Sequence, residues 1–289
     1  MTGTEQQPIL RLSAVDKVFG RGGQPAPTAL QGIDLEIRRG EFVSLIGPSG
    51  CGKSTLLRVI GDLVPATRGD VVVNGKPAAM ARRDRDYGIV FQAPVLFEWR
   101  SVEDNVKLPL EILGRPPAER AKRAREMLQL VELADFTRHY PYQLSGGMQQ
   151  RVAIARALSI EPALLLMDEP FGALDEMTRE RMNSEVLRIW ERTGTTIVFV
   201  THSIPEAVFL SSRVVVMSAR PGRITKVIDI DLPRPRDLET RESRRYFELV
   251  TDVREALRAG GGLEGDDADG GAGGGIASEE RTLAEGAVG

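Results

Sequence analysis

The sequence is short of three features that would each define a class of protein. It contains a single cysteine, Cys51, so an intramolecular disulfide framework is excluded. Its 38 Lys and Arg residues stand against 41 Asp and Glu residues, so it lacks the basic surplus of a protein that neutralises nucleic-acid phosphates over a wide surface. Its longest apolar runs, such as Ala163 to Met167, fall far short of the ~20 residues that cross a bilayer. Any membrane role must therefore come through a partner.

The beginning of the chain and its overall composition bear on location and size. Met1 to Gln7 are polar and lack the charged and apolar regions of a signal peptide. Together with the single cysteine, this favours the cytoplasm. With 289 residues, of which 42% are apolar, the chain can bury the core of one large or two small domains.

Short apolar runs indicate strands that are buried on both faces of a parallel sheet. Phe42 to Ile46 and Ala163 to Met167 are predominantly apolar and bounded by turn or polar residues, and Thr196 to Val200 and Arg213 to Met217 are similar. Segments with helical periodicity alternate with these runs. The alternation predicts a doubly wound α/β core with a parallel sheet.

Two further kinds of segment flank this predicted core. Residues 9–15, 33–37 and 71–73 have the pattern of short, half-exposed strands, which predicts an antiparallel β layer. Between about residues 95 and 160 the pattern is only helical. We therefore expect a helical subdomain that is inserted into the α/β core.

The carboxyl-terminal part of the chain divides into a helix and a tail. Apolar residues from Tyr246 to Leu257 are spaced as in an amphipathic helix. Residues 259–289 are dominated by Gly, Ala and acids and have too few apolar groups to offset the entropy of ordering them. The sequence thus predicts one domain over residues 9–258, followed by a disordered tail.

A glycine-rich segment predicts a phosphate-binding loop. It matches G-x-x-x-x-G-K-[ST] and lies between the predicted strand Phe42 to Ile46 and a helical run from Lys53 to Ile60. Glycines in this pattern let backbone N–H groups surround anionic oxygens at a helix N-terminus, where the helix dipole also favours phosphate. We expect Lys53 to reach the β- and γ-phosphates, Ser54 to ligate Mg²⁺ and Thr55 to approach the α-phosphate. The predicted nucleotide-binding residues are Gly47, Pro48, Ser49, Gly50, Cys51, Gly52, Lys53, Ser54 and Thr55.

Cys51 lies between glycines of this loop. A helix N-terminus and the neighbouring Lys53 would lower the pKa of its thiol and favour the thiolate. We therefore expect alkylation of Cys51 to abolish activity and bound Mg-ATP to protect it. The alternative is an inert small residue in the loop.

Two adjacent acids predict a catalytic and a metal-binding carboxylate. Asp168 and Glu169 end the apolar run Ala163 to Met167, so they should lie at the carboxyl edge of the sheet beside the phosphate-binding loop. Asp168 would hold Mg²⁺ through water, and Glu169 would face the γ-phosphate and accept a proton from the attacking water. The alternative is a pair of acids at a helix start before Pro170.

The segment Leu144 to Arg151 (LSGGMQQR) predicts a second anion site. It precedes a helical run, so Ser145, Gly146 and Gly147 should form another exposed helix N-terminus, which has no lysine. Here the sequence resembles the ATP-binding-cassette (ABC) family, whose signature is LSGGQ. Met148 replaces the glutamine of that signature, so any ribose contact from that side chain is lost.

The other elements of the ABC family occur in order, over roughly residues 9–230. The resemblance implies that Gln92 contacts Mg²⁺ or the lytic water and that His202 hydrogen-bonds the γ-phosphate. It places Asp175 among the nucleotide-binding residues. It also implies that Phe19 stacks on adenine, although a core phenylalanine that ends the first strand is the alternative.

The resemblance further implies how the protein works with others. It predicts an ATP- and Mg²⁺-dependent ATPase that pairs head to tail with a second copy of itself, without nucleic acid. The chain would lie on the cytoplasmic face of the membrane, against a multi-span permease that is served by an external substrate-binding protein. Leu96 to Val106, Leu108 to Glu111, Arg220 to Ile224 and Leu232 to Arg236 resemble the nitrate, sulfonate and taurine importer ATPases. The alternatives are a nucleic-acid-handling ABC ATPase and a small-molecule kinase, which would have no use for the LSGG segment.

Overall fold

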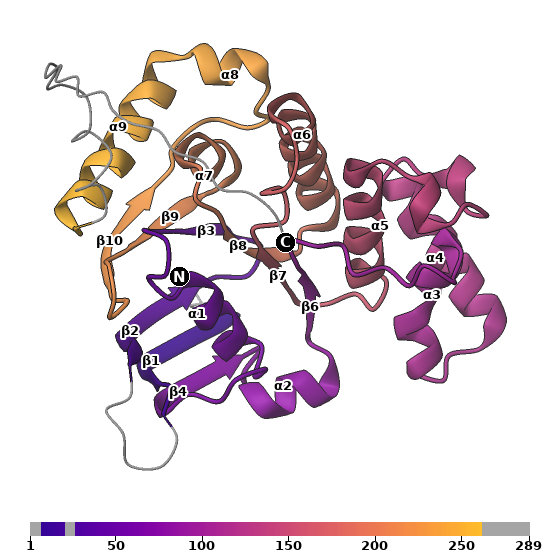
Figure 1. Ribbon diagram of the computed structural model, residues 1–289, viewed down its shortest axis with the longest axis horizontal. Helices are drawn as coiled ribbons and strands as arrows, with labels where there is room; N and C mark the ends of the chain where they lie inside the picture. The colour runs from indigo at the N-terminus through magenta and orange to yellow at the C-terminus, as the bar shows by residue number, and fades with distance from the viewer. Residues whose placement is uncertain (1–6, 21–26, 262–289) are drawn as a thin grey trace, which may run out of the picture.

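The computed structural model describes residues 7–20 and 27–261. A six-stranded sheet runs through its middle (Figure 1). Most neighbouring strands of this sheet are parallel, and β10 alone is antiparallel to its neighbour β9. β3, β7 and β8 are buried at every position, as their apolar sequences require. In spatial order the strands are β10 (Ile224–Asp229), β9 (Arg213–Met217), β3 (Phe42–Ile46), β8 (Thr196–Val200), β7 (Leu164–Asp168) and β6 (Tyr87–Val90).

A second, four-stranded antiparallel sheet lies below the central sheet in the view of Figure 1. Its order is β2 (Thr28–Ile37), β1 (Leu10–Val18), β4 (Arg68–Val73) and β5 (Lys76–Pro77). The predicted antiparallel layer is confirmed, but β1 and β2 are longer than residues 9–15 and 33–37. Their pairing is interrupted by register shifts, and Ala14 has a positive φ of 47°, so the alternation of apolar and polar residues is lost over the extra length.

Three helices between β6 and β7 form a group on one side of the molecule, away from the antiparallel sheet (Figure 1). They are α3 (Val102–Ile112), α4 (Pro117–Leu130) and α5 (Gly146–Leu158). The remaining helices are α1 (Lys53–Ile60), α2 (Ala78–Asp84), α6 (Glu176–Thr193), α7 (Ile204–Leu210), α8 (Leu238–Glu242) and α9 (Arg244–Ala259). The α/β class with a parallel sheet, an antiparallel layer and an inserted group of helices is therefore confirmed. The disorder expected of the tail lies outside the described residues from position 262 onward.

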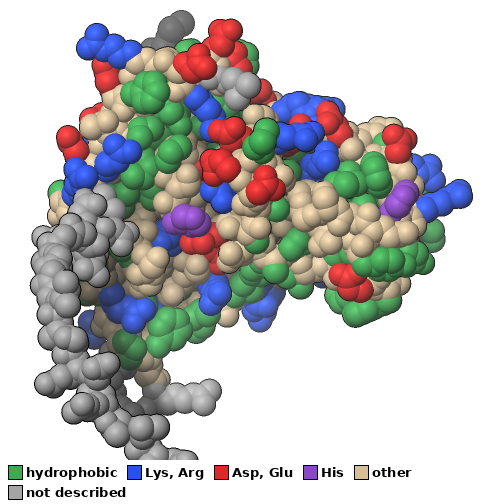
Figure 2. All heavy atoms as spheres, turned by 45° about the horizontal axis from the view of Figure 1, so that its top comes forward, with side chains coloured by type: hydrophobic (Ala, Val, Ile, Leu, Met, Phe, Trp, Pro, Cys, Tyr) green, Lys and Arg blue, Asp and Glu red, His purple; other side chains and the backbone are tan. Residues whose placement is uncertain are grey.

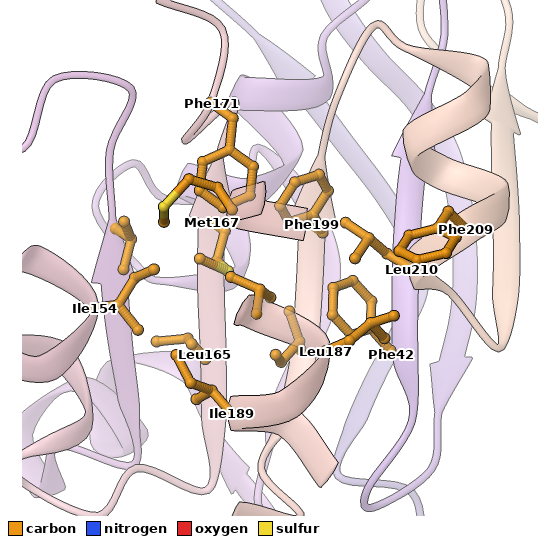
Figure 3. Packing of buried hydrophobic residues seen from close by; sticks show 14 of the residues in the cluster. Phe42, Ile154, Leu165, Met167, Phe171, Leu187, Ile189, Phe199, Phe209 and Leu210 are labelled. Atoms are coloured by element: carbon orange, nitrogen blue, oxygen red, sulfur yellow. The ribbon is translucent and has the colours of Figure 1, made fainter. Parts of the chain in front are cut away.

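Aromatic residues of the core hold the carboxyl ends of β7 and β8 in place (Figure 3). The Phe199 ring of β8 lies 5.8 Å from the ring of Phe171, which follows β7, and 5.8 Å from the ring of Phe42 on β3. Met167, the residue before Asp168, is fully buried in the same cluster. Asp168 and Glu169 are therefore fixed between two buried anchors, Met167 and Phe171.

Candidate functional site

The predicted phosphate-binding loop borders a hollow of about 290 Å³. Gly50 and Gly52 have positive φ angles of 72° and 109°, which glycine adopts without strain, and Gly52 is the N-cap of α1. A side chain at Gly52 would also come within 2.9 Å of the carbonyl oxygen of Ala29. The loop therefore has the glycines that its curvature and its packing require. The hollow is lined by Phe19, Pro27, Ala29, Ser49, Gly50, Gly52, Lys53, Ser54, Thr55, Glu169 and Arg220.

Lys53 is folded against its own loop. Its Nζ donates to the carbonyl oxygens of Gly47 at 2.7 Å and Pro48 at 3.1 Å. The side chain lines the hollow, and these two bonds hold the ammonium at the first residues of the loop. A phosphate in the hollow would offer it charged acceptors, which form stronger hydrogen bonds than neutral carbonyls.

Ser54 and Asp168 meet across the site, as the sequence predicts for two metal-binding residues. The Ser54 Oγ donates to Asp168 Oδ1 at 2.7 Å, which joins the start of α1 to the end of β7. Hydroxyl and carboxylate oxygens are hard donors of the kind that Mg²⁺ prefers, and this ion usually takes one or two protein ligands together with water and phosphates. Over residues 7–20 and 27–261 no three His, Cys, Asp or Glu side chains cluster as a closed cage. The Ser54 and Asp168 pair thus fits Mg²⁺ brought in with a nucleotide.

Glu169 and His202 lie together because β7 and β8 are parallel neighbours that end at the same edge of the sheet. The His202 Nδ1 is 3.4 Å from Glu169 Oε2. Glu169 has a left-handed φ of 45°, a conformation that costs a residue with a side chain roughly 1–3 kcal/mol. Its N–H donates to the Val200 carbonyl at 3.0 Å and its carbonyl accepts from Gly172, so the turn is fixed from both sides. The strained turn places the carboxylate on the hollow rather than in the core.

Gln92 lies next to this acidic turn but does not line the hollow. Its side chain is exposed, and a Cβ at Gly172 would be 3.1 Å from its Nε2. Gln92 is therefore beside the Glu169 to Gly172 turn, on the path from β6 to the helical group. Figure 2 shows one face of the molecule, on which a histidine lies beside acidic and basic side chains.

Ser145, Gly146 and Gly147 begin α5, away from the hollow. The Ser145 Oγ accepts from the Met148 N–H at 3.4 Å, so Ser145 is the N-cap of α5, as expected of an exposed helix N-terminus. Ser145 and Gly147 border a different cavity of about 300 Å³, which shares no lining residue with the first. Within one chain, therefore, the two predicted phosphate sites are not brought together.

Phe19 and Asp175 differ in their relation to the hollow. Phe19 lines it, and 45% of its surface is exposed, so it is not the core phenylalanine of the alternative interpretation. The Lys17 Nζ lies 5.0 Å from the centre of its ring. Asp175 does not line the hollow: it caps α6 by accepting from the Thr178 N–H at 3.0 Å, a bond that lowers the pKa of its carboxyl. This helix cap is formed within a single chain and does not depend on a nucleotide or a second copy.

The expected activation of Cys51 is wrong. Its side chain is only 1% exposed, and burial raises the pKa of the thiol, although Lys53 acts in the opposite direction. The sequence shows the adjacent lysine, but it does not show the residues that cover the thiol. Cys51 thus matches the alternative of an inert small residue in the loop.

Arg220 is a residue of the hollow that sequence reasoning missed. It follows β9, and its Nη2 donates to the Gly50 carbonyl at 3.2 Å. The sequence offered one signal, because Arg220 begins one of the importer-like segments, but nothing in that resemblance placed it beside the phosphate-binding loop.

Comparisons with known proteins agree with this geometry. The family model described as "ABC transporter" matches residues 30–172. Two solved structures have the same fold. The dimeric post-hydrolysis state of an ATP-binding cassette bound to ADP and Pi is 37% identical, with a TM-score of 0.66 over 76% of this chain and 98% of that one. A Clostridium perfringens component of an ABC transporter complex is 28% identical, with a TM-score of 0.71 over 88% of this chain and 98% of that one.

Several relatives are similar over most of their length. An uncharacterized ABC transporter ATP-binding protein of Methanocaldococcus jannaschii is 47% identical over 84% of this chain and 90% of its own. An aliphatic sulfonates import ATP-binding protein of Bacillus cereus is 41% identical over 86% and 96%, and a taurine import ATP-binding protein of Rhizobium johnstonii is 46% identical over 80% and 88%. In the described residues no helix is long and apolar enough to cross a membrane. The chain belongs to the ABC transporter family, as an ATP-binding ATPase.

Proposed function

We propose that this chain hydrolyses ATP in the hollow beside Lys53 and thereby powers the import of a small solute through a separate multi-span permease. The observation that carries the proposal is the arrangement around one hollow: a phosphate-binding loop, the Ser54 and Asp168 pair, and Glu169 with His202 beside it. A nucleotide-binding protein without hydrolysis would have no use for a strained turn that holds a carboxylate there.

The proposed roles follow from the contacts of each side chain. Backbone N–H groups of the loop and Lys53 bind the phosphates, with Lys53 exchanging its carbonyl partners for phosphate oxygens. Glu169 accepts the proton of the attacking water, and His202 hydrogen-bonds the γ-phosphate while it lies beside Glu169. Gln92, next to the same turn, contacts the water or the ion. Bound Mg²⁺, held by Ser54 and Asp168, would neutralise phosphate charge.

We further propose that each ATP is shared between two copies of the chain. In one chain the LSGG segment at the start of α5 borders a separate cavity, so it is free to face the hollow of a second copy. That segment would add N–H donors of a helix N-terminus, and Phe19 would stack on the adenine. Asp175 is the N-cap of α6, and Thr178 in the first turn of that helix borders the same cavity as the LSGG segment. Asp175 would therefore lie at the interface between the two copies.

Mixed dimers test the shared site. If sites form between chains, a Lys53→Ala chain paired with a Ser145→Arg chain keeps one intact site, whereas a chain with both changes paired with wild type has two damaged sites. If sites form within a chain, this order of ATPase rates reverses. A higher rate in the pairing that contains the doubly changed chain would therefore refute the proposal.

The solute and the partners are proposed from the relatives and from one exposed loop. Relatives named for sulfonate and taurine import favour a small anionic or zwitterionic solute of that kind, and they favour an importer over the nucleic-acid-handling alternative. Trp99 is 73% exposed and packs edge to face on Phe97, as an aromatic anchor for a membrane partner would. We place the chain on the cytoplasmic face of the membrane, with an external substrate-binding protein that delivers the solute.

The decisive experiment for this part is copurification. An affinity-tagged chain, extracted with mild detergent from its own cells, should retain a multi-span membrane protein. A Trp99→Ser variant should retain less, and Met177→Ser, a change at another highly exposed apolar residue, should not differ from wild type. Recovery of the unchanged chain without any membrane protein would contradict the permease partnership.

A further inference from the structure

The turn between β9 and β10 is hydrogen-bonded to another part of the molecule through Gly222. The Gly222 N–H donates to the Ala29 carbonyl at 2.9 Å, and the Gln31 N–H donates to the Gly222 carbonyl at 2.9 Å. These two bonds join the turn to β2 of the other sheet. The turn is therefore a bridge between the two sheets rather than a free hairpin end.

The same glycine also lies against the phosphate-binding loop. A Cβ at Gly222 would overlap the carbonyl oxygen of Cys51, so the turn touches the loop with no room for a side chain. A turn that is held on both sides can present a side chain at a fixed place. The side chain so presented is that of Arg220, two residues earlier.

Arg220 has spare hydrogen-bonding capacity inside the nucleotide hollow. A guanidinium has five N–H donors, and the contact to the Gly50 carbonyl uses one of them. In the described part of the chain Arg220 forms no ion pair with an acid. Its neighbour Arg223 differs, because its Nη2 donates to Gln31 Oε1 at 2.6 Å and it does not line the hollow.

The charged residues that line the hollow leave room for a second cation to bind phosphate there. Among the residues that the structure describes, Lys53 is the other cation that lines it, and Glu169 contributes a negative charge to the same hollow. A nucleoside triphosphate brings a charge of roughly −4, and guanidinium groups bind phosphate through paired N–H donors. Arg220 contacts the loop at Gly50, whereas Lys53 contacts it at Gly47 and Pro48.

We propose that Arg220 is a nucleotide-binding residue that contacts the phosphate chain and makes the site prefer polyphosphates. The inference rests on the proposed function, in that it places ATP in this hollow. It adds a second cation that comes from the β9–β10 turn rather than from the loop itself. Because the turn is attached to both sheets, the cation is positioned before the nucleotide arrives.

The test measures binding, not hydrolysis. Equilibrium affinities of the full chain for a non-hydrolysable ATP analogue, ADP, AMP and adenosine, each with Mg²⁺, are compared between wild type and Arg220→Gln. Arg220→Lys retains the charge, and Arg223→Gln is the matched control on the same turn. We expect Arg220→Gln to weaken the analogue by about 10-fold or more, ADP by less and adenosine hardly at all, since hydrogen bonds to charged groups are the strong ones. Arg220→Lys should lie between, and Arg223→Gln should match wild type.

Three results would overturn the inference: analogue affinity of Arg220→Gln within 2-fold of wild type, an equal loss for adenosine, or an equal loss in Arg223→Gln. An equal loss for adenosine would assign Arg220 to the base or ribose, and an equal loss in Arg223→Gln would assign the effect to the turn's structure. If the wild-type chain itself fails to bind the analogue, the proposed function fails instead. Salt gives an independent readout, because binding by Arg220→Gln should depend less steeply on ionic strength.

Discussion

Replacing Gly222 with alanine would test whether the β9–β10 turn supports the phosphate-binding loop. The added methyl group would overlap the Cys51 carbonyl oxygen and lie 3.2 Å from that of Ala29. A carbon atom approaches a carbonyl oxygen to about 3.3 Å, so the turn must retreat by roughly 1 Å. Its two hydrogen bonds to β2, both 2.9 Å long, would then stretch beyond useful length.

The expected cost can be worked out from those two bonds. At about 1 kcal/mol each, their loss lowers the free energy of unfolding by about 2 kcal/mol. For a chain of this size that corresponds to a fall in Tm of about 3–4 °C. Because the retreating turn also displaces Arg220, which contacts the loop at Gly50, affinity for a non-hydrolysable ATP analogue should fall severalfold.

The assay compares thermal unfolding and analogue binding of Gly222→Ala with those of Gly260→Ala. A Cβ at Gly260 would meet Ala256, Leu257 and Thr225 at ordinary distances of 3.5 to 3.6 Å, so this control should leave both quantities near wild type. A Gly222→Ala chain that keeps the wild-type Tm and the wild-type affinity would refute the supporting role of the turn.

Three other expected outcomes follow from the site and its surroundings. Glu169→Gln should still bind ATP while turnover falls by about 10²-fold or more, and near-normal hydrolysis by the purified variant would disprove its role as the base. Because burial raises the pKa of Cys51, its thiol should stay protonated at pH 8 and react with iodoacetamide at least about 10-fold more slowly in the native than in the unfolded chain; equal rates would show that the loop opens. Asn105 is fully buried and its side chain bonds Phe97, Arg100 and Ser101, so Asn105→Ala should lower the free energy of unfolding by about 2–3 kcal/mol, and an unchanged denaturation midpoint would contradict this.

Much of the central sheet could be predicted to the residue. β3, β8 and β9 begin and end where their apolar runs do, and α1 begins at Lys53 as the phosphate-loop pattern requires. Strands that are buried on both faces have nearly continuous apolar sequences, so their ends can be recognised in the sequence. The edge strand β10 was missed, because most of its residues 224–229 are exposed and its apolar and polar residues neither alternate nor form one run. Its place in the sheet is set by its pairing with β9.

Site residues could be predicted from the sequence where a motif stands at the end of a strand. They could not be predicted where a segment that is distant in the sequence packs on the phosphate-binding loop. Asp168, Glu169 and His202 meet because parallel strands end at one edge of a sheet, which is a property of the fold class. Cys51 is buried in a core cluster that gathers residues from distant parts of the chain, and Arg220 reaches the loop from the distant turn between β9 and β10. Local sequence carries the charge of Lys53 but not the burial that outweighs it.

The helical group gives the site a mechanical link to its surroundings that does not pass through the sheet. From α5, Gln150 donates to the Phe91 carbonyl at 3.0 Å, and Arg156 donates to the carbonyls of Val95 at 2.8 Å and Pro94 at 3.0 Å. The segment that follows β6 is thus hydrogen-bonded to α5 at several points, and the N-cap of α5 is Ser145.

The consequence is that Gln92 and the LSGG segment should move together. Asn105 of α3 ties the exposed Trp99 loop into the same unit by its bond to Phe97. A partner that displaces this loop would shift Gln92 relative to Glu169 and, through α5, Ser145 relative to a second chain. Hydrogen bonds from Arg156 to backbone carbonyls transmit this motion, so Arg156→Gln should weaken the coupling between partner binding and ATP turnover. The hollow itself should not change, since Arg156 does not line it. Partner-stimulated and basal ATPase rates of that variant would separate the two effects, and equal stimulation in wild type and variant would show that the coupling takes another route.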